Sequence, residues 1–146
     1  MKILNLALIG AIVALTGCAA SGPKFTEVQS TMPKLNADQG RVYFYRSSSM
    51  FGAAMQPAIV FDGAEVGKSQ PGGYFYVDAA VGSHEASAST EATNKVTFVL
   101  EKGETKYVRT SPQMGLLVGH VVPELVGQDD AQKELAELSY TGTKVK

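Results

Sequence analysis

The chain has 146 residues, of which 45% are hydrophobic, and this length suits a single small domain. Its 13 basic and 14 acidic side chains leave no excess of positive charge to attract phosphate groups, so nucleic acid is excluded as a partner. The sequence contains one cysteine and therefore no pair for a disulfide bond, so packing alone must hold the domain together.

The N-terminal residues 1–17 have the layout of a secretory signal peptide. Lys2 supplies a positive charge, and the apolar run Ile3–Leu15 is too short to cross about 30 Å of hydrocarbon. The run ends in Leu-Thr-Gly-Cys, which matches the bacterial lipobox and predicts that Cys18 is acylated and becomes the new N-terminus. Several acyl chains, at about 0.8 kcal/mol per buried methylene, would anchor the protein in a membrane. The alternative is an unmodified thiol beside an ordinary cleavage site.

The sorting rule of bacterial lipoproteins extends this prediction to a compartment. Lipoproteins with aspartate after the cysteine tend to stay in the inner membrane, whereas this chain has Ala19. By that resemblance we expect a cell-envelope protein facing the periplasm, in the outer rather than the inner membrane of a cell with two. Residues 18–39 would be the lipidated cysteine and a tether, with one short ordered piece around residues 25–28.

From Gly40 onward the pattern is that of β-structure. Short segments rich in β-formers are separated by turn dipeptides about every 8 to 12 residues, which predicts a small antiparallel β-sandwich or a partly open barrel. The predicted strands are residues 41–46, 57–61, 65–68, 74–78, 84–89, 95–100, 105–110 and 116–122, the last of them ended by Pro123. No alternation of strands and helices appears, which disfavours a doubly wound fold.

One C-terminal helix is predicted after the strands. Asp129 as N-cap and Gln132 three residues later would form a capping box. Lys133 and Glu137 are spaced to pair across one turn. The helix has an apolar stripe of Ala131, Leu135 and Leu138. We expect it to cover a sheet face or an open edge, within a β-domain of residues 40–140 that is followed by a frayed tail, residues 141–146.

Four segments of this β-region resemble a known family. They are residues 40–46, 48–54, 72–78 and 107–109, and together they are similar to the bacterial lipoproteins that carry a domain of unknown function, number 2846. The likeness covers about 100 residues and implies no activity, cofactor or catalytic residue. The turn residues around Asp62-Gly63 and Val81-Gly82 are also similar, more weakly, to β-sandwich modules of the PEGA type.

Catalytic and metal-binding motifs are sparse. The histidines are His84 and His120, both in predicted strands, and no nucleophile elbow accompanies them. His84 and Glu85 are adjacent on a strand and point to opposite faces, so they would not form a dyad. The chain has no ligand spacing typical of zinc or calcium sites, so we expect neither a metal nor a cofactor. The sequence favours a non-catalytic protein; an envelope hydrolase that uses His84 or His120 remains an alternative.

Two apolar segments lie where we expect connections between strands. Met50, Phe51 and Met55 belong to the first, and Met114 and Leu116 to the second. Such segments can simply plug the ends of a sandwich core, or they can form an adaptable patch that binds lipid, peptide or protein.

Tyrosines on the predicted strands offer a second candidate surface. Tyr43 and Tyr45 project to one face of their strand, and Arg41 and Arg46 flank them. Burial of this face under the tether or the helix is one interpretation, and a tyrosine-arginine face for protein contact is the other.

Taken together, these features predict a lipid-anchored envelope protein that presents a β-domain for protein or ligand binding near the membrane. A larger envelope protein complex is its candidate partner. A direct lipid-binding module remains another alternative, and it would require a hollow apolar cavity between the sheets.

Overall fold

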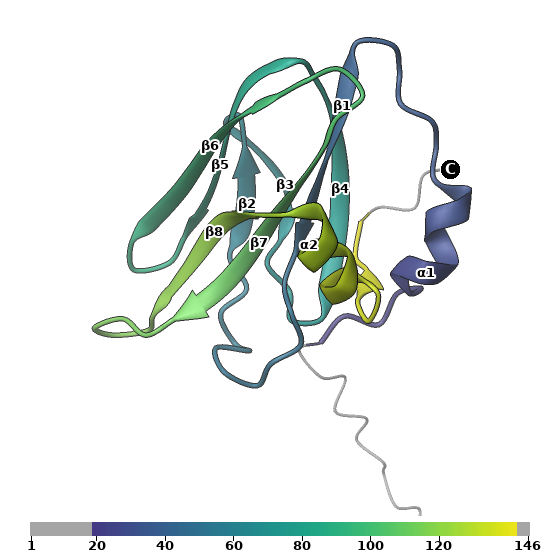
Figure 1. Cartoon of the computed structure of the whole chain (residues 1–146). Helices are drawn as coiled ribbons and strands as arrows, with labels where there is room; N and C mark the ends of the chain where they lie inside the picture. The colour runs from purple at the N-terminus through teal and green to yellow at the C-terminus, as the bar shows by residue number, and fades with distance from the viewer. Residues whose placement is uncertain (1–18, 143–146) are drawn as a thin grey trace, which may run out of the picture.

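A computed structural model describes residues 19–142 of the protein as two facing β-sheets with a layer of helices on one side (Figure 1). The predicted signal peptide, the predicted acylation site Cys18 and residues 143–146 of the predicted tail lie outside the described residues. In chain order the elements are α1 (Phe25–Val28), the 3-10 turn η1 (Gln29–Thr31), β1 (Gln39–Tyr45), β2 (Ala58–Phe61), β3 (Ala64–Lys68), β4 (Gly73–Ala80), β5 (Gly82–Ser89), β6 (Thr93–Leu100), β7 (Thr105–Gln113), β8 (His120–Val126), α2 (Gln128–Leu135) and β9 (Ser139–Tyr140).

The strands form a sandwich of two open sheets, so the predicted class is confirmed and the sandwich rather than the barrel is observed. The first sheet has the strand order β8-β7-β1-β4-β9 and the second has the order β3-β2-β5-β6. The second sheet is antiparallel throughout, whereas the first also contains the parallel pairs β1–β7 and β4–β9. In the first of these pairs Arg41 lies opposite Thr105.

The main hydrophobic core lies between the two sheets. Alternate residues of each strand point inward, as the period of two requires. Phe44 of β1 stacks on Phe75 of β4 with ring centroids 5.3 Å apart and meets Phe61 of β2 edge-on at 5.6 Å. The buried residues of this core are Val42, Phe44, Ile59, Phe61, Phe75, Ala86, Ala88, Phe98, Leu100, Val108 and Val121.

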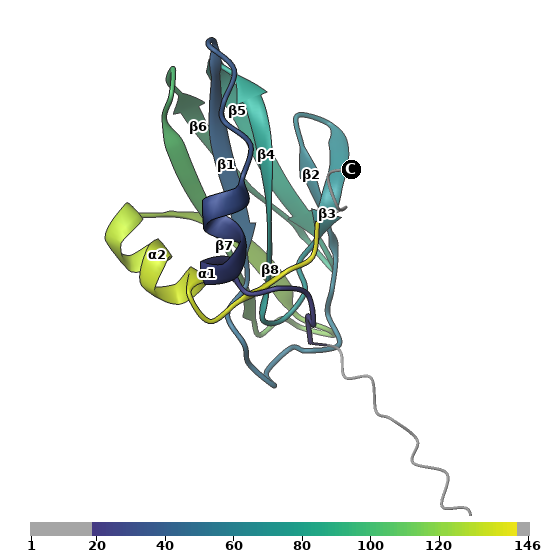
Figure 2. The ribbon, with the colours of Figure 1, turned by 90° about the vertical axis from the view of Figure 1, so that its right-hand side faces the viewer.

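A second core covers the outer face of the first sheet, where α1 and α2 lie (Figure 2). The other set of alternate residues points there, and these are mostly tyrosines. Tyr43 stacks on Tyr107 with centroids 5.5 Å apart, and Phe25 of α1 meets Tyr43 edge-on at 5.8 Å. The buried members of this second core are Phe25, Tyr43, Tyr45, Tyr74, Tyr107, Ala131, Leu135 and Leu138. Ala131 and Leu135 of the predicted apolar stripe lie on the C-terminal helix, which covers a sheet face. Leu138 is also buried in this core, but it follows the helix, which ends at Leu135.

The last long strand differs from its prediction. β8 begins at His120 rather than at residue 116, and it continues through Pro123 to Val126. Proline lacks an N–H donor and is tolerated on an edge strand, and β8 is the edge of the first sheet. Residues 116–118, which were assigned to the strand because they are apolar, form the connection that precedes it.

The start of α2 also differs from its prediction. Its N-cap is Gly127, without a side-chain cap, so Asp129 lies inside the first turn. There its negative charge is favoured by the helix dipole. Lys133 lies 3.7 Å from Asp130 rather than pairing with Glu137. Among residues 19–142, no helix has the length and hydropathy needed to span a bilayer.

Candidate functional site

Large apolar side chains are exposed at one end of the sandwich, on two loops. The first loop connects β1 to β2 and the second connects β7 to β8; both lie at the lower end in Figures 1 and 2. Leu116, at the tip of the second loop, is 98% exposed, and Met50 in the first loop is 91% exposed. We call this surface the apolar end and define it by Met50, Phe51, Met114, Leu116, Leu117 and Val118.

The two loops touch each other. Gly52 has a φ of +65°, and a Cβ at this position would lie 2.7 Å from the Cβ of Pro112 in β7. Met55 is partly buried against the main core, and its methyl group lies close to Gly119. Between the loops lies an open cavity of about 240 Å³, lined chiefly by Phe51, Met55, Met114, Leu117 and Val118. Of the predicted binding residues, Phe51, Met55 and Met114 therefore line one cavity, and Met50 and Leu116 are exposed on the same two loops.

A buried arginine holds the β1–β2 loop. Arg46 directly follows β1 and is 1% exposed. Its guanidinium donates to the carbonyl oxygens of Met55, of Gly52 at 2.7 Å and of Ser69 at 3.1 Å. Burial lowers the pKa of Arg46, and the guanidinium is hydrogen-bonded to three carbonyl oxygens, none of which carries a negative charge. The loop carbonyls are thereby satisfied from the inside, while Met50 and Phe51 face outward.

A glutamate from the other sheet holds the β7–β8 loop in the complementary way. The carboxylate of Glu91, in the β5–β6 turn, accepts hydrogen bonds from the backbone N–H groups of Leu116 at 2.7 Å, Leu117 at 2.8 Å and Val118 at 3.0 Å. These bonds hold the pKa of Glu91 below its ordinary value. In the same turn, the Thr90 hydroxyl donates to the carbonyl of Gly119 at 2.7 Å. The loop N–H groups are satisfied, and the apolar side chains remain outside.

Neither loop carries a charged residue of its own. Residues 47–56 and 112–119 contain no Asp, Glu, Lys or Arg. The charges that organise these loops, on Arg46 and Glu91, lie beneath them. The apolar end therefore presents hydrocarbon and sulfur to its surroundings with much of its backbone already hydrogen-bonded.

The start of the described chain lies at the same end (Figures 1 and 2). The N–H of Ala20 donates to the carbonyl of Pro71 at 3.0 Å, in the β3–β4 turn. The next residue of that turn, Gly72, donates its N–H to the carbonyl of Arg46, and a Cβ on Gly72 would lie 2.7 Å from the Ser48 hydroxyl. The β3–β4 turn thus connects the beginning of the chain to the β1–β2 loop.

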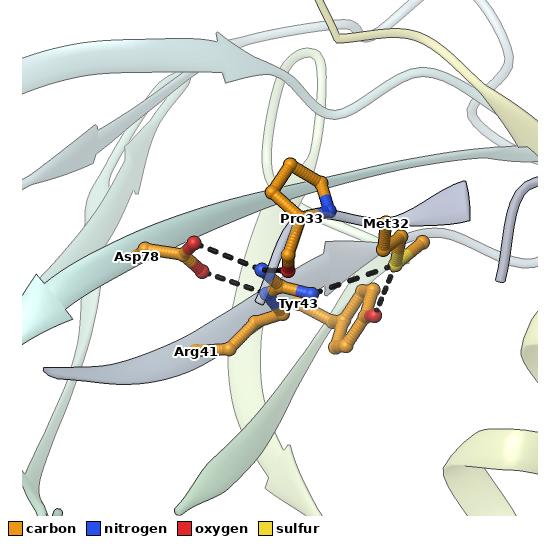
Figure 3. Close-up of polar contacts among 5 residues, drawn as sticks. All are labelled: Met32, Pro33, Arg41, Tyr43 and Asp78. Atoms are coloured by element: carbon orange, nitrogen blue, oxygen red, sulfur yellow. Dashed lines mark hydrogen bonds and ion pairs between the residues drawn. The ribbon is translucent and has the colours of Figure 1, made fainter. Parts of the chain in front are cut away.

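Of the two interpretations of the tyrosine-arginine face, the structure shows burial under the N-terminal segment and the helix. Tyr43 and Tyr45 belong to the second core, so they are not available to a partner in this structure. Arg41 forms a two-point pair with Asp78 at 2.7 and 2.9 Å and donates to the carbonyl of Pro33 at 2.8 Å (Figure 3). The hydroxyl of Tyr43 lies 2.8 Å from the Met32 sulfur. These contacts fasten the N-terminal segment to β1 and β4.

The two histidines differ in their surroundings: both ring nitrogens of His84 have hydrogen-bond partners, whereas Nδ1 of His120 is buried and has none among the described residues. His84 lies 2.6 Å from Asp62 through Nδ1 and 2.7 Å from the Ala80 carbonyl through Nε2. Burial alone would lower the pKa of His84, but these two hydrogen bonds raise it. His120 lies 3.4 Å from Glu91 through Nε2. In the part of the chain that the structure describes, no Ser or Thr hydroxyl is hydrogen-bonded to either ring, and no three His, Cys, Asp or Glu side chains are placed to hold a metal ion.

Sequence reasoning missed the two charged residues that hold the loops of the apolar end. Leu117 and Val118 belong to the apolar segment that begins at Met114 and also fall in the predicted strand 116–122; their exposure places them on the surface. Arg46 and Glu91 have no sequence signal beyond being charged residues near apolar loops, because their partners are backbone atoms.

Comparison with protein families gives one match. The family described as "Protein of unknown function (DUF2846)" matches residues 36–122, which is more than half of the chain and runs from just before β1 into β8. No curated protein and no solved structure matches the chain.

Proposed function

The chain belongs to the DUF2846 family, and for this member we propose the function of a lipid-anchored bacterial envelope protein that binds a protein or ligand close to the membrane without catalysing a reaction. The proposed anchor is an acylated Cys18, by the lipobox in the sequence. The proposed location is the periplasmic side of the envelope, at the outer membrane where the cell has two membranes. This location follows from the lipoprotein sorting rule, because Ala19 rather than aspartate follows the cysteine.

One observation carries this proposal. Ala20, two residues after Cys18, is hydrogen-bonded to Pro71 at the end of the domain that exposes its apolar side chains. Two residues span at most about 7 Å, so acyl chains on Cys18 would hold this end of the domain next to the bilayer. The segment behind Ala20 is fastened as well: Lys24 pairs with Ser139, and Arg41 holds Pro33. The domain would therefore sit on the membrane instead of swinging on a long tether.

The contacts of His84 support a non-catalytic role for this residue. A general base needs a ring nitrogen within reach of the group from which it takes a proton. Both nitrogens of His84 have protein partners, a carboxylate and a backbone carbonyl. An envelope hydrolase is the second candidate, and its one favourable feature is the His84–Asp62 pair. Substituting His84 and His120 with Ala should leave the cellular phenotype unchanged if the protein acts by binding, and should abolish it if a histidine is catalytic.

Metabolic labelling tests the anchor. Cells that produce the full chain are grown with radiolabelled palmitate, and the protein is then recovered from separated inner and outer membranes. We expect label in the wild-type protein and its recovery with the outer membrane. Cys18→Ser should remove both the label and the membrane fractionation, whereas Ser21→Ala, a nearby control, should change neither. Fractionation that is the same in the wild-type protein and in C18S would refute the anchor.

A further inference from the structure

We propose that the apolar end is a second membrane-binding element, which inserts its loop side chains into the phospholipid surface beside the lipid anchor. This inference rests on the proposed function for the position of the bilayer, and it adds a direct contact between protein side chains and lipid. The occupant of the apolar end is thus a bilayer rather than a groove-binding peptide or a second protein.

The chemistry of the exposed groups fits a lipid surface. The apolar end gathers two leucines, a valine, a phenylalanine and two methionines on loops that contain no charge. Apolar side chains of this kind enter the boundary between headgroups and acyl chains. Exposed apolar groups on a typical protein surface are scattered singly, whereas Leu116, Leu117 and Val118 are consecutive and all exposed.

Several backbone N–H and C=O groups of these loops are already hydrogen-bonded within the protein, as insertion into a lipid surface requires. An unsatisfied N–H or C=O is costly in hydrocarbon, because no solvent can pair with it. Glu91 takes the N–H groups of residues 116–118, and Arg46 takes the carbonyls of Gly52 and Met55. Arg46 is buried behind its loop, and the Glu91 carboxylate is occupied by these three N–H groups.

The position of the loops favours a membrane over a protein partner. Ala20, the second described residue, is hydrogen-bonded to the β3–β4 turn beside the β1–β2 loop. Acyl chains two residues earlier would place lipid at this end of the domain. The opposite end carries the β4–β5 turn with Val81, because β1 and β4 are antiparallel and Gln39 lies opposite Ala80. One end of the sandwich would therefore face lipid and the other would face away.

Tryptophan fluorescence tests this orientation, since the chain contains no tryptophan. The full acylated chain with Leu117→Trp, or with Val81→Trp as matched control, is reconstituted into phosphatidylethanolamine–phosphatidylglycerol vesicles with or without bromine on the acyl chains. We expect the L117W emission to shift to shorter wavelength and to be strongly quenched by the brominated lipid, while V81W keeps its intensity. If L117W alters the far-UV circular dichroism, Leu116→Trp replaces it, because Leu116 is even more exposed.

The outcomes separate this inference from the proposed function. Equal fluorescence of L117W in brominated and plain vesicles overturns the inference, and palmitate on Cys18 would still support the anchor. Quenching of L117W without palmitate incorporation supports the lipid contact and removes the anchor. A shift of L117W that needs added envelope proteins and is not quenched by brominated lipid overturns the inference in favour of a protein partner.

Discussion

The guanidinium of Arg46 donates to the carbonyl oxygen of Gly52 at 2.7 Å from a position almost without solvent access. The arginine and the glycine belong to one connection, so a charge at the end of β1 fixes the shape of the loop that follows it. A buried arginine whose partners are carbonyls costs desolvation free energy that no opposite charge offsets. What it contributes is a defined loop conformation at the apolar end.

The first prediction concerns this loop. Arg46→Met keeps an unbranched side chain and removes all the donors to Gly52, Met55 and Ser69. Buried carbonyls that lose their donor are costly, so we expect the free energy of unfolding in urea to fall by about 2 kcal/mol. The N–H of Met55, which donates to Gly52, should exchange with deuterium faster than in the wild-type protein.

Arg109→Met is the matched control for this change. Arg109 is partly exposed and pairs with Glu124 and Glu134, so its removal should cost about 1 kcal/mol or less. It should leave exchange at Met55 unaltered. An R46M protein as stable as the wild type, with unchanged exchange at Met55, would contradict a role of Arg46 in holding the loop.

The second prediction concerns the carboxylate under the β7–β8 loop. Its three backbone bonds lower the pKa of Glu91, so its stabilising effect is present above the ordinary pKa of 4.5 and is lost as pH falls through the lower folded value. The amide proton shifts of residues 116–118 should therefore titrate together, with a midpoint below 4.5. Nuclear magnetic resonance of the folded protein measures this midpoint directly.

Glu91→Gln should abolish that titration and speed the exchange of these amides, because one amide oxygen replaces two charged acceptors. Glu85→Gln is the control, since the Glu85 carboxylate pairs with Lys95 at 3.0 Å rather than with the loop. Amides 116–118 that respond equally to E85Q and E91Q would argue against the observed hydrogen bonds.

The third prediction concerns His84 and Asp62. The pKa of His84 is raised in the folded protein. The contribution of His84 to the stability of the fold is therefore complete below the ordinary pKa of 6.5 and is lost as the pH rises through the pKa of the folded state. Burial alone would raise the pKa of Asp62, but hydrogen bonds from the Glu85 N–H and from His84 lower it. The contribution of Asp62 to the stability of the fold is therefore complete above the ordinary pKa of 3.8 and is lost as the pH falls below that value. Together they stabilise the β2–β3 turn most between these two values.

Asp62→Asn tests this pair with little change of shape, and asparagine tolerates the positive φ of +49° at this position. The midpoint of the His84 ring titration should move to lower pH. Glu65→Gln removes a charge of the same sign from β3 and should leave the midpoint where it is in the wild type. A His84 midpoint that D62N does not lower would show that the carboxylate is not its charged partner in solution.

The fourth prediction concerns the fastening of the N-terminal segment by Arg41. Asp78→Ala removes the two-point partner that orients the guanidinium toward Pro33. We expect a loss of about 2 kcal/mol in the free energy of unfolding and faster cleavage by trypsin after Lys34, because the segment is released. The rate of proteolysis is read from the disappearance of intact chain under native conditions.

Asp38→Ala is the control, because Asp38 is exposed and its pair with Lys102 is 3.7 Å long. Its effect on stability should stay within about 0.5 kcal/mol, as for most surface substitutions. If D78A is cleaved no faster than D38A, the segment is held by Phe25 in the second core and not by the arginine.

The fold was largely predictable because its signals are local. The alternation of large residues in Val42-Tyr43-Phe44-Tyr45 identified β1, and the observed strand differs from the prediction by two residues at its start and one at its end. The pairing of β1 with β7 was not foreseen, since parallel neighbours distant in the sequence leave no local pattern. The edge position that admits Pro123 into β8 is likewise a property of the finished sheet.

The candidate site was predicted only in part. Met50, Phe51, Met114 and Leu116 stood out as apolar residues in places where turns were expected, and the structure brings them to one end. Tyr43 and Tyr45 have the same large side chains, yet helices cover them, and only the tertiary structure separates the two cases.

The parallel pairing of β1 with β7 sets the order in which the molecule can fold. During synthesis, β1 leaves the ribosome long before Thr105 of β7. One edge of β1 therefore stays unpaired until β7 has been made. Proteins rich in such distant pairings fold slowly. The first sheet can therefore be completed only after β7 has been synthesised, when more than two thirds of the chain has been made.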